Sequence, residues 1–463
     1  MPTPAIPGST QTVSLLQKIQ RIIRPLETLE KQAHIYGDIF TFSAGSNANP
    51  QVIVSNPEGI QKIFSTDINQ LDSGAEAGIK LPLLGQNSLL ALGGDRHKKQ
   101  RKLLMPPFHG ERMRAYGELI HNITEQIANQ WEIDKVFSIR SSMQAISFDV
   151  ILKAVFGLEE GSRYEQLKEL LISRLNPRRP FLQTIMLVFP VLQKDLGSWS
   201  PWGRFLRQRR KMDELIYAEI RERWSKLDPS STDILSLMMS ARDENGEPMT
   251  EVELRDELMT LLVAGHETTA TSLAWAFYWI HHQPQVREKL LQELDTLGNK
   301  PKPNDIIKLP YLNAVCQETL RIYPVVNFSL PRLVKSPLEI MGYQLEPGSI
   351  VSACIYLTHH REDLYPEPKQ FKPERFLERQ FTPNEYLPFG GGNRRCLGYA
   401  FALFEMKLVL ATLLSKWELE LADKKPVKPV QKGLLMAPKD GVPMVVKGKR
   451  PQSQEVLQTV SSL

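Results

Sequence analysis

The segment that most constrains the fold is residues 389–398, where three consecutive glycines and two arginines precede a single cysteine, Cys396. Residues 399–410 follow directly, and their mostly apolar, glycine-free pattern predicts a buried helix. Cys396 should therefore lie at a helix N-terminus, where the helix dipole and unpaired backbone N–H groups stabilise an anionic sulfur. The glycines let the backbone turn sharply and lie close against a large, flat molecule.

A cation close to this cysteine extends the pattern. Arg394 has the reach and the charge to meet an acidic group on a bound molecule. A thiolate, a loop for close approach and a nearby cation are together typical of a haem iron ligand with a propionate partner. Two other interpretations stay open from these residues alone: a flexible loop with a structural cysteine, and a hydrolase nucleophile. The second needs a histidine base, and none of the nine histidines lies near Cys396 in the sequence.

The glycine-rich segment also matches a known motif. Its pattern, Phe-x-x-Gly-x-Arg-x-Cys-x-Gly, is complete and resembles the haem-binding loop of the cytochrome P450 family. The resemblance implies a haem b cofactor whose iron is bound by the thiolate of Cys396. It further implies that Arg394 contacts a haem propionate and that Phe389 and Gly398 belong to the cofactor site.

Residues 250–282 predict a long central helix. Thr250 and Glu253 form a capping-box start, and the helical pattern continues to about residue 282. Its apolar middle is interrupted by the acid and the two hydroxyls of residues 267–269, which are costly to bury without partners. A threonine hydroxyl can also bond a carbonyl one turn back, which loosens the helix and opens a groove for a small ligand. A kinked core helix without a catalytic role is the alternative.

This interruption, residues 264–269, resembles the oxygen-binding motif of the same family. The resemblance implies two catalytic residues, with Thr268 as a hydrogen-bond donor and Glu267 as a proton relay. It also implies that Ala264 lies against the haem.

Two further groups of charged residues resemble family motifs. Glu318 and Arg321 share a helix face, and together with Arg375 they resemble a Glu-Arg-Arg cluster that braces the haem loop, a structural role. Arg332 matches a position that commonly meets a haem propionate.

His97 and Arg101 lie one helical turn apart, so both can donate hydrogen bonds to propionates. Many members of the family carry tryptophan at the position of His97. Because imidazole can titrate near neutrality, the contact of His97 is less firmly implied than that of Arg101.

Composition sets the broad class. The 463 residues are 42% hydrophobic and 24% charged, as in ordinary globular proteins with a large core. No composition shift marks a second domain, so we expect one domain over residues 1–463 with loose tails at about 1–10 and 449–463. A net charge of +5 without a dense basic tract argues against nucleic-acid binding. Three widely spaced cysteines fit a reducing cytosol.

The N-terminal residues contain no stretch of about 20 apolar residues that could anchor the chain in a membrane. The resemblance therefore implies a soluble, bacterial-type, cytoplasmic member, with peripheral membrane contact left open. Residues 108–112 also resemble cyanobacterial members. Helical patterns dominate residues 97–300, while residues 37–55 predict a hairpin and residues 336–356 short strands. The predicted fold class is mainly α, the cytochrome P450 fold with a small β-rich part.

The function implied by the resemblance is that of a monooxygenase that inserts one atom of dioxygen into a lipophilic substrate, such as a fatty acid, an alkane or a terpenoid. A non-oxygenating haem-thiolate isomerase or dehydratase is the alternative, and the intact pair Glu267 and Thr268 argues against it. By resemblance, a mostly apolar pocket is lined by the loop over residues 81–92 and by further residues. These are Val325, Val326, Phe328, Leu435 and Met436.

Electrons must come from another protein, because the chain has no room for a fused reductase. We expect a ferredoxin with its ferredoxin reductase, docking on a cationic face that includes Lys98, Lys99 and Lys102, and we expect a monomer.

Overall fold

The structure is a computed structural model of the 463-residue chain. The residues that it describes are 5–8, 23–42, 51–79, 83–108, 112–158, 161–175, 193–226, 231–298 and 301–451. Most of the expected tails lie outside these ranges, as do residues 80–82, which include the start of the expected pocket loop, and residues 109–111.

Helices form the larger part of the described chain. The α-helices are α2 (Pro25–Tyr36), α3 (Pro57–Ser65), α4 (Gly94–Leu104), α5 (Arg112–Ala128), α6 (Ile139–Phe156), α7 (Ser162–Leu175), α9 (Pro201–Ser225), α10 (Ile234–Ser240), α11 (Glu251–His282), α12 (Pro284–Asp295), α13 (Pro303–Ile306), α14 (Pro310–Ile322), α15 (Ile355–His359), α16 (Arg375–Glu378) and α17 (Tyr399–Lys416).

The strands are short and gather in four sheets. They are β1 (Ile39–Phe42), β2 (Gln51–Val54), β3 (Leu71–Asp72), β4 (Val136–Ser138), β5 (Arg332–Val334), β6 (Leu338–Ile340), β7 (Tyr343–Leu345), β8 (Ile350–Ala353), β9 (Trp417–Leu421), β10 (Pro429–Lys432), β11 (Leu435–Pro438) and β12 (Pro443–Lys449). The largest sheet has the order β1-β2-β8-β5-β3, and the others are β10-β11, β4-β12-β9 and β6-β7.

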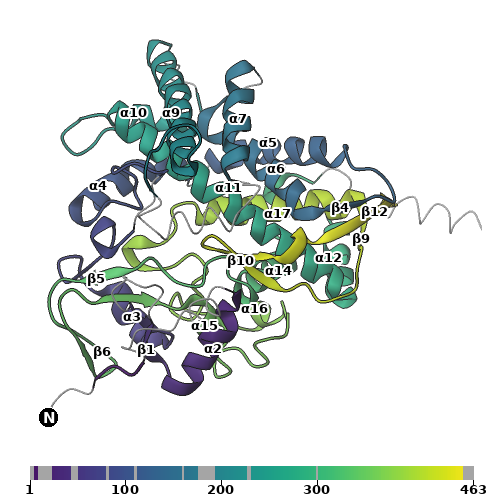
Figure 1. Ribbon diagram of the computed structural model, residues 1–463. Helices are drawn as coiled ribbons and strands as arrows, with labels where there is room; N and C mark the ends of the chain where they lie inside the picture. Colours follow the sequence, from purple (N-terminus) through teal and green to yellow (C-terminus); the bar gives the residue numbers. More distant parts are fainter. Residues whose placement is uncertain are drawn as a thin grey trace, which may run out of the picture.

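The long helix α11 passes through the centre of the molecule (Figure 1). It packs against α6, α9, α14, α17 and strand β11. Its start is fixed locally, because the Thr250 side chain accepts from the Glu253 backbone N–H while the Glu253 carboxylate accepts from the Thr250 N–H. The predicted central helix and its capping box are therefore confirmed.

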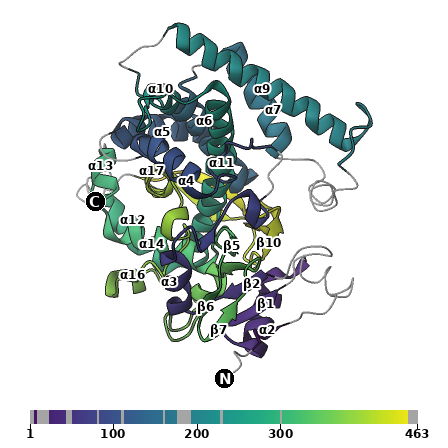
Figure 2. The ribbon, with the colours of Figure 1, turned by 90° about the vertical axis from the view of Figure 1, so that its left-hand side faces the viewer.

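The helical and β-rich parts lie at different ends of the molecule. Helices α5, α6, α7 and α9 occupy the upper part of the view, and strands β1, β2, β6 and β7 with α2 and α3 occupy the lower part (Figure 2). The predicted hairpin is present, with β1 and β2 antiparallel and Ile39 opposite Val54. Strand β2 then pairs in parallel with β8, Gln51 opposite Ile350, which ties the N-terminal hairpin to the predicted strands of residues 336–356.

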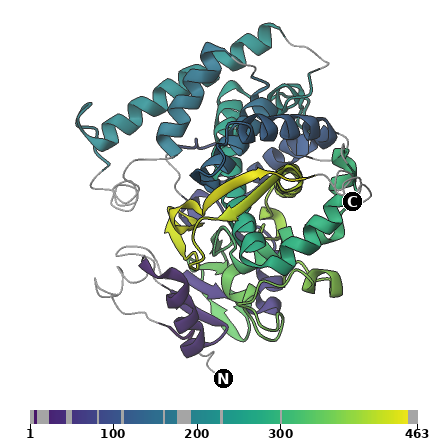
Figure 3. The ribbon, with the colours of Figure 1, turned by 90° about the vertical axis from the view of Figure 1, so that its right-hand side faces the viewer.

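The C-terminal strands β9 and β12 cross the molecule between these two parts (Figure 3). Strand β12 ends at Lys449, and both Nη atoms of Arg450 donate to the carboxylate of Asp295, at 2.6 and 2.7 Å. The largest hydrophobic cluster joins side chains from α4 to β12, including Leu103, Leu273 and Val446.

Candidate active site

Cys396 lies at the end of a closed loop. Its backbone N–H donates to the carbonyl of Phe389 at 2.9 Å, and α17 begins three residues later with Gly398 as its N-cap. A Cβ at Gly391 would lie 2.2 Å from the Phe64 ring of α3, so packing of the loop against α3 requires glycine there. At Gly398, by contrast, no heavy atom beyond its chain neighbours lies within 4 Å of an added Cβ. The loop is thus packed on one side and open beside the helix start.

The Cys396 thiol differs from the other two cysteines. Cys316 and Cys354 are buried, and burial raises the pKa of each thiol to about 12. Burial also raises the pKa of Cys396, while the Gly398 N–H and the charges of Arg101 and Arg395 lower it. The side chain nevertheless has accessible surface. We take this surface to face interior space, because the depth that raises the pKa is incompatible with a position on the outer surface.

The four residues expected at the propionates come together. His97 is buried in α4, and its imidazole interacts electrostatically with Arg394, Arg101 and Arg332. The carboxylate of Asp72 also interacts with His97. Burial and then the arginine charges lower the pKa of His97 to about 3, so the imidazole is neutral at neutral pH. Three guanidinium groups facing one carboxylate leave an excess of positive charge, which a haem with two propionates would balance.

Both buried arginines are held by backbone carbonyls. The Nη atoms of Arg332 donate to Ile63 and Gly391, and its guanidinium lies 5.3 Å from the centre of the Phe64 ring. Burial, and then the charge of Arg394, lowers the pKa of Arg332 to about 10. Nε of Arg332 and Nε of Arg394 are buried without a hydrogen-bond partner. Two orphaned donors in a positive cluster fit an anionic ligand. The Nη atoms of Arg394 donate to the carbonyls of Ser73, Leu89 and Leu92 and to the Asp72 carboxylate.

The middle of α11 presents two of the predicted residues on one face. Ala264 is exposed and Thr268 half-buried, although most residues of the helix are buried. They are four residues apart, so they lie one above the other on the helix. The Thr268 hydroxyl donates to the Ala264 carbonyl at 2.6 Å, the back-bonding that the sequence suggested.

Glu267 points to a different neighbour, helix α6. Its carboxylate accepts from Nη2 of Arg140 and from Nε2 of Gln144, each at 2.5 Å, and all three side chains are buried. The sequence did not identify Arg140 or Gln144. The only available signal was that a buried carboxylate needs partners, and this signal does not say which residues supply them.

Three of the expected pocket residues lie near one another. The Met436 N–H donates to the Val325 carbonyl at 2.8 Å, and Leu435 precedes Met436 in β11. Nε1 of Trp275 in α11 donates to the Met436 carbonyl at 2.9 Å, which fixes β11 to the central helix. Leu435 is half-buried and Met436 buried.

The other two expected pocket residues pack elsewhere as well. Val326 contacts the hydrophobic cluster of the large sheet, and Phe328 packs against Phe42, with ring centres 6.3 Å apart. Both remain half-buried. Their packing against the β-rich part gives them a structural role whether or not they contact a substrate.

The charged cluster around Glu318 is assembled and fully buried. Its carboxylate accepts from Nε and Nη2 of Arg321, at 2.6 and 2.8 Å, and from Nε of Arg375 at 3.2 Å. The Lys372 backbone N–H donates to the same carboxylate at 2.8 Å. The cluster thus joins α14 to the start of α16.

The lysines of α4 are paired, in contrast to the cationic face that the sequence suggested. Each lies close to a carboxylate, and two of these carboxylates come from residues 243–244, which are remote in sequence. The pairs are Lys98 with Asp95 at 3.4 Å, Lys99 with Asp243 at 2.6 Å and Lys102 with Glu244 at 3.0 Å. The positive excess near Cys396 is therefore carried mainly by Arg101 and Arg395.

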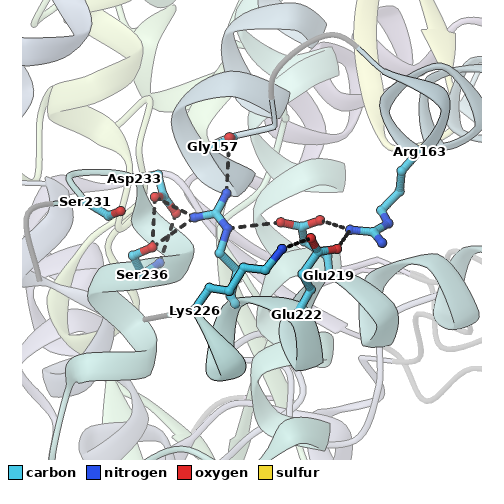
Figure 4. Close-up of a pocket in the computed structure, with 9 residues that line it drawn as sticks. Gly157, Arg163, Glu219, Glu222, Lys226, Ser231, Asp233 and Ser236 are labelled. Atoms are coloured by element: carbon cyan, nitrogen blue, oxygen red, sulfur yellow. Dashed lines mark hydrogen bonds and ion pairs between the residues drawn. The ribbon is translucent and has the colours of Figure 1, made fainter. Parts of the chain in front are cut away.

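A polar pocket of about 290 Å³ lies among α6, α7, α9 and α10, apart from these residues (Figure 4). Arg223 donates to Glu219, Asp233 and Ser236, and Arg163 donates to Glu219 and pairs with Glu222 (Figure 4). The positive and negative side chains of the pocket pair with one another. We therefore interpret the pocket as a group of ion pairs that joins the helices.

Together these residues define the class of site. Among the described residues no group of three or more His, Cys, Asp or Glu side chains could hold a bare metal ion. A haem needs only an axial ligand from the protein, and Cys396, just before α17, could supply a thiolate. The arginine cluster could supply partners for the propionates. The site is that of a haem-thiolate protein.

Comparison with known proteins gives the family. The Cytochrome P450 family model matches residues 6–444, so the chain belongs to the cytochrome P450 family. Cytochrome P450 135B1 of Mycobacterium tuberculosis is 35% identical over 450 residues, which cover 97% of this chain and 92% of that protein. Cytochrome P450 138 of the same organism is 31% identical over 450 residues, which cover 96% of this chain and 97% of that protein.

A solved structure shows the same fold. The retinoic acid-bound cyanobacterial CYP120A1 superposes with a TM-score of 0.82 at 25% sequence identity, covering 96% of this chain and all of that one. The predicted mainly α fold, the haem cofactor and the monooxygenase class are therefore confirmed. Across the described ranges, no helix combines the length and apolar character needed to cross a bilayer.

Proposed function

We propose that this cytochrome P450 hydroxylates a largely hydrocarbon substrate, such as a fatty acid, an alkane or a terpenoid, in the cytoplasm. The observation that carries the proposal is the apolar composition of the predicted pocket wall, formed by Val325, Leu435 and Met436. The Met436 N–H donates to the Val325 carbonyl, and the Met436 carbonyl accepts from the Trp275 side chain of α11. A wall of apolar side chains favours an apolar ligand. The retinoic acid bound by CYP120A1 is a terpenoid acid, which supports the terpenoid class among the three.

Three residues of the chain have separate roles in the proposed reaction. A bound haem would supply dioxygen activation, with two electrons from a redox partner, and Cys396 would hold the haem and donate electron density to its iron. Thr268 holds a hydroxyl on the accessible face of α11, one turn from Ala264. Arg140 and Gln144 hold the Glu267 carboxylate in place, and we propose that this carboxylate takes up protons from solvent and passes them toward Thr268.

Enlarging Leu435 is expected to weaken substrate binding. Leu435→Phe adds volume to a half-buried side chain of β11, so it should fill part of the pocket and lower ligand affinity by roughly tenfold. The measurement is the spin-state shift of the ferric haem during titration with retinoic acid, a saturated fatty acid and an alkane.

The neighbouring residue offers a matched control. Leu434 is 72% exposed, so Leu434→Phe makes the same chemical change outside the proposed pocket. If Leu435→Phe and Leu434→Phe bind the lipophilic probes with equal affinity, the proposal that β11 lines the pocket is wrong. A shift with none of the three lipophilic probes would count against the substrate class itself.

We further propose that a ferredoxin, reduced by a ferredoxin reductase, delivers the electrons near α4 to a monomeric enzyme. Arg101 and Arg395 both interact electrostatically with Cys396, which supports a position of α4 on the thiolate side of the proposed haem. A small acidic protein would be steered toward this positive excess.

Charge reversal on α4 tests this docking. Lys102→Glu should slow haem reduction by a ferredoxin several-fold at low ionic strength and have little effect at high salt, because steering between exposed charges is screened. The rate is measured by stopped-flow absorbance. Lys369→Glu is the control, since Lys369 is 71% exposed, Lys102 is 73% exposed, and each lies in a surface ion pair. Equal rates in both variants would place the docking site elsewhere.

A further inference from the structure

His359 is a buried imidazole that the haem site described above does not include. It is the last residue of α15 and is 0% exposed. Its ring is stacked on Tyr386, with ring centres 5.5 Å apart and planes inclined by 17°. Both ring nitrogens have partners, and these partners belong to two distant segments of the chain.

One partner belongs to the segment that leads into the haem loop. The Leu387 backbone N–H donates to Nε2 of His359 at 3.0 Å. A backbone N–H can only donate, so Nε2 is the unprotonated nitrogen of the ring. The Leu387 carbonyl then accepts from the Gly390 N–H at 2.9 Å, inside the loop that closes at Phe389 and Cys396.

The other partner belongs to the Glu318 cluster. Since Nε2 carries no proton, Nδ1 carries it and lies 3.3 Å from the Arg321 carbonyl, to which it donates. Nη1 of Arg321 donates in return to the His359 carbonyl at 2.8 Å. Residue 321 is thus bonded to residue 359 through both its main chain and its side chain.

The charge state of the imidazole is fixed by its surroundings. Burial, followed by the positive charge of Arg321, lowers the pKa of His359 well below its usual value. A protonated ring would also lose the acceptor that Leu387 uses. His359 therefore remains neutral over the working range of the enzyme, with one tautomer selected by its two neighbours.

We propose that His359 is a positioning residue for the haem thiolate. Its imidazole links the Glu318–Arg321 cluster through hydrogen bonds to the loop carrying Cys396, and this link fixes the position of the loop. The bridge runs from Arg321 through the imidazole to Leu387 and from there through Gly390 into the loop. It acts on the loop from the side of α14, whereas Gly391 packs against Phe64 of α3. The loop that carries the thiolate is thereby fixed by His359 from the side of α14 and by Phe64 from the side of α3.

The test compares three variants by the spectrum of the reduced carbonyl complex. His359→Leu removes both ring nitrogens and leaves the buried Leu387 N–H without an acceptor. His359→Gln keeps an acceptor for Leu387, because the Gln side-chain carbonyl can reach the place of Nε2. His360→Leu is the control, since the described partner of His360 is the Tyr356 carbonyl of its own helix, at 2.8 Å.

The expected result is a selective loss of thiolate ligation. In mild denaturant, the red-shifted band of the thiolate complex should disappear at least about tenfold faster in His359→Leu than in the parent, the size expected for a buried donor that loses its partner. His359→Gln should restore most of the parent rate, and His360→Leu should stay close to the parent. Far-ultraviolet circular dichroism, recorded in parallel, should show the helices still folded when the band is lost.

Two outcomes would overturn the proposal. One is that the band decays equally fast in His359→Leu and His360→Leu, or without rescue by Gln. The other is that band loss and helix unfolding coincide in His359→Leu, in which case the residue only stabilises the fold. Neither outcome depends on the substrate or the redox partner.

Discussion

Replacing Cys396 by alanine is expected to abolish the strongly red-shifted Soret band of the reduced carbonyl complex. That band arises from electron donation by a thiolate sulfur to the haem iron, and an alanine side chain has no atom to donate. Of the three cysteines, Cys396 alone has accessible surface. The measurement is a difference spectrum of the reduced protein with and without carbon monoxide.

Cys316→Ala provides the control for this experiment. Cys316 is buried in α14, where burial raises the pKa of its thiol to about 12, so it is a neutral packing group. Its replacement should leave the band in place. An unchanged band in Cys396→Ala, or a band lost in Cys316→Ala alone, would contradict the ligand assignment.

The features that the sequence predicted are those determined by residues close together in the chain. The capping box of Thr250 and Glu253 fixes the start of α11 within one turn. The glycine-rich segment and the apolar run after it likewise place Cys396 just before α17. Short-range patterns of this kind need no knowledge of the packing.

The features that the sequence did not predict depend on how distant helices meet. Arg140 and Gln144 are 127 and 123 residues from Glu267, and nothing in the pattern of α6 marks them as its partners. The sequence indicated a cationic face that includes the lysines of α4. Lys102, however, pairs with Glu244, which lies 142 residues further along the chain. Local periodicity shows that a group is buried or charged, whereas its partner is chosen by tertiary packing.

His359 illustrates the same limit for a polar bridge. Its position at the end of a short helix gives no hint of a function, and its two partners are 38 and 28 residues away. The Glu318 and Arg321 pair was recognisable because one helical turn separates the two residues. The connection from that pair to the haem loop became visible only with the fold.

Replacing Thr268 by alanine is expected to separate electron consumption from product formation. The change removes one hydroxyl on the accessible face of α11, and no residue of the cysteine loop or the arginine cluster is touched, so haem binding should persist. Because positioned proton donors typically contribute 10²–10⁴-fold, product formed per electron should fall by roughly tenfold or more. The electrons then reduce dioxygen to hydrogen peroxide or to water, and both peroxide and product are measured against electrons consumed.

Thr269→Ala, a change at a buried residue on another face of the same helix, should keep the parent ratio, and Thr268→Ser should recover much of it. If Thr268→Ala keeps the parent ratio, Thr268 has no role beyond its hydrogen bond to the Ala264 carbonyl, and Glu267 would have to deliver protons without it.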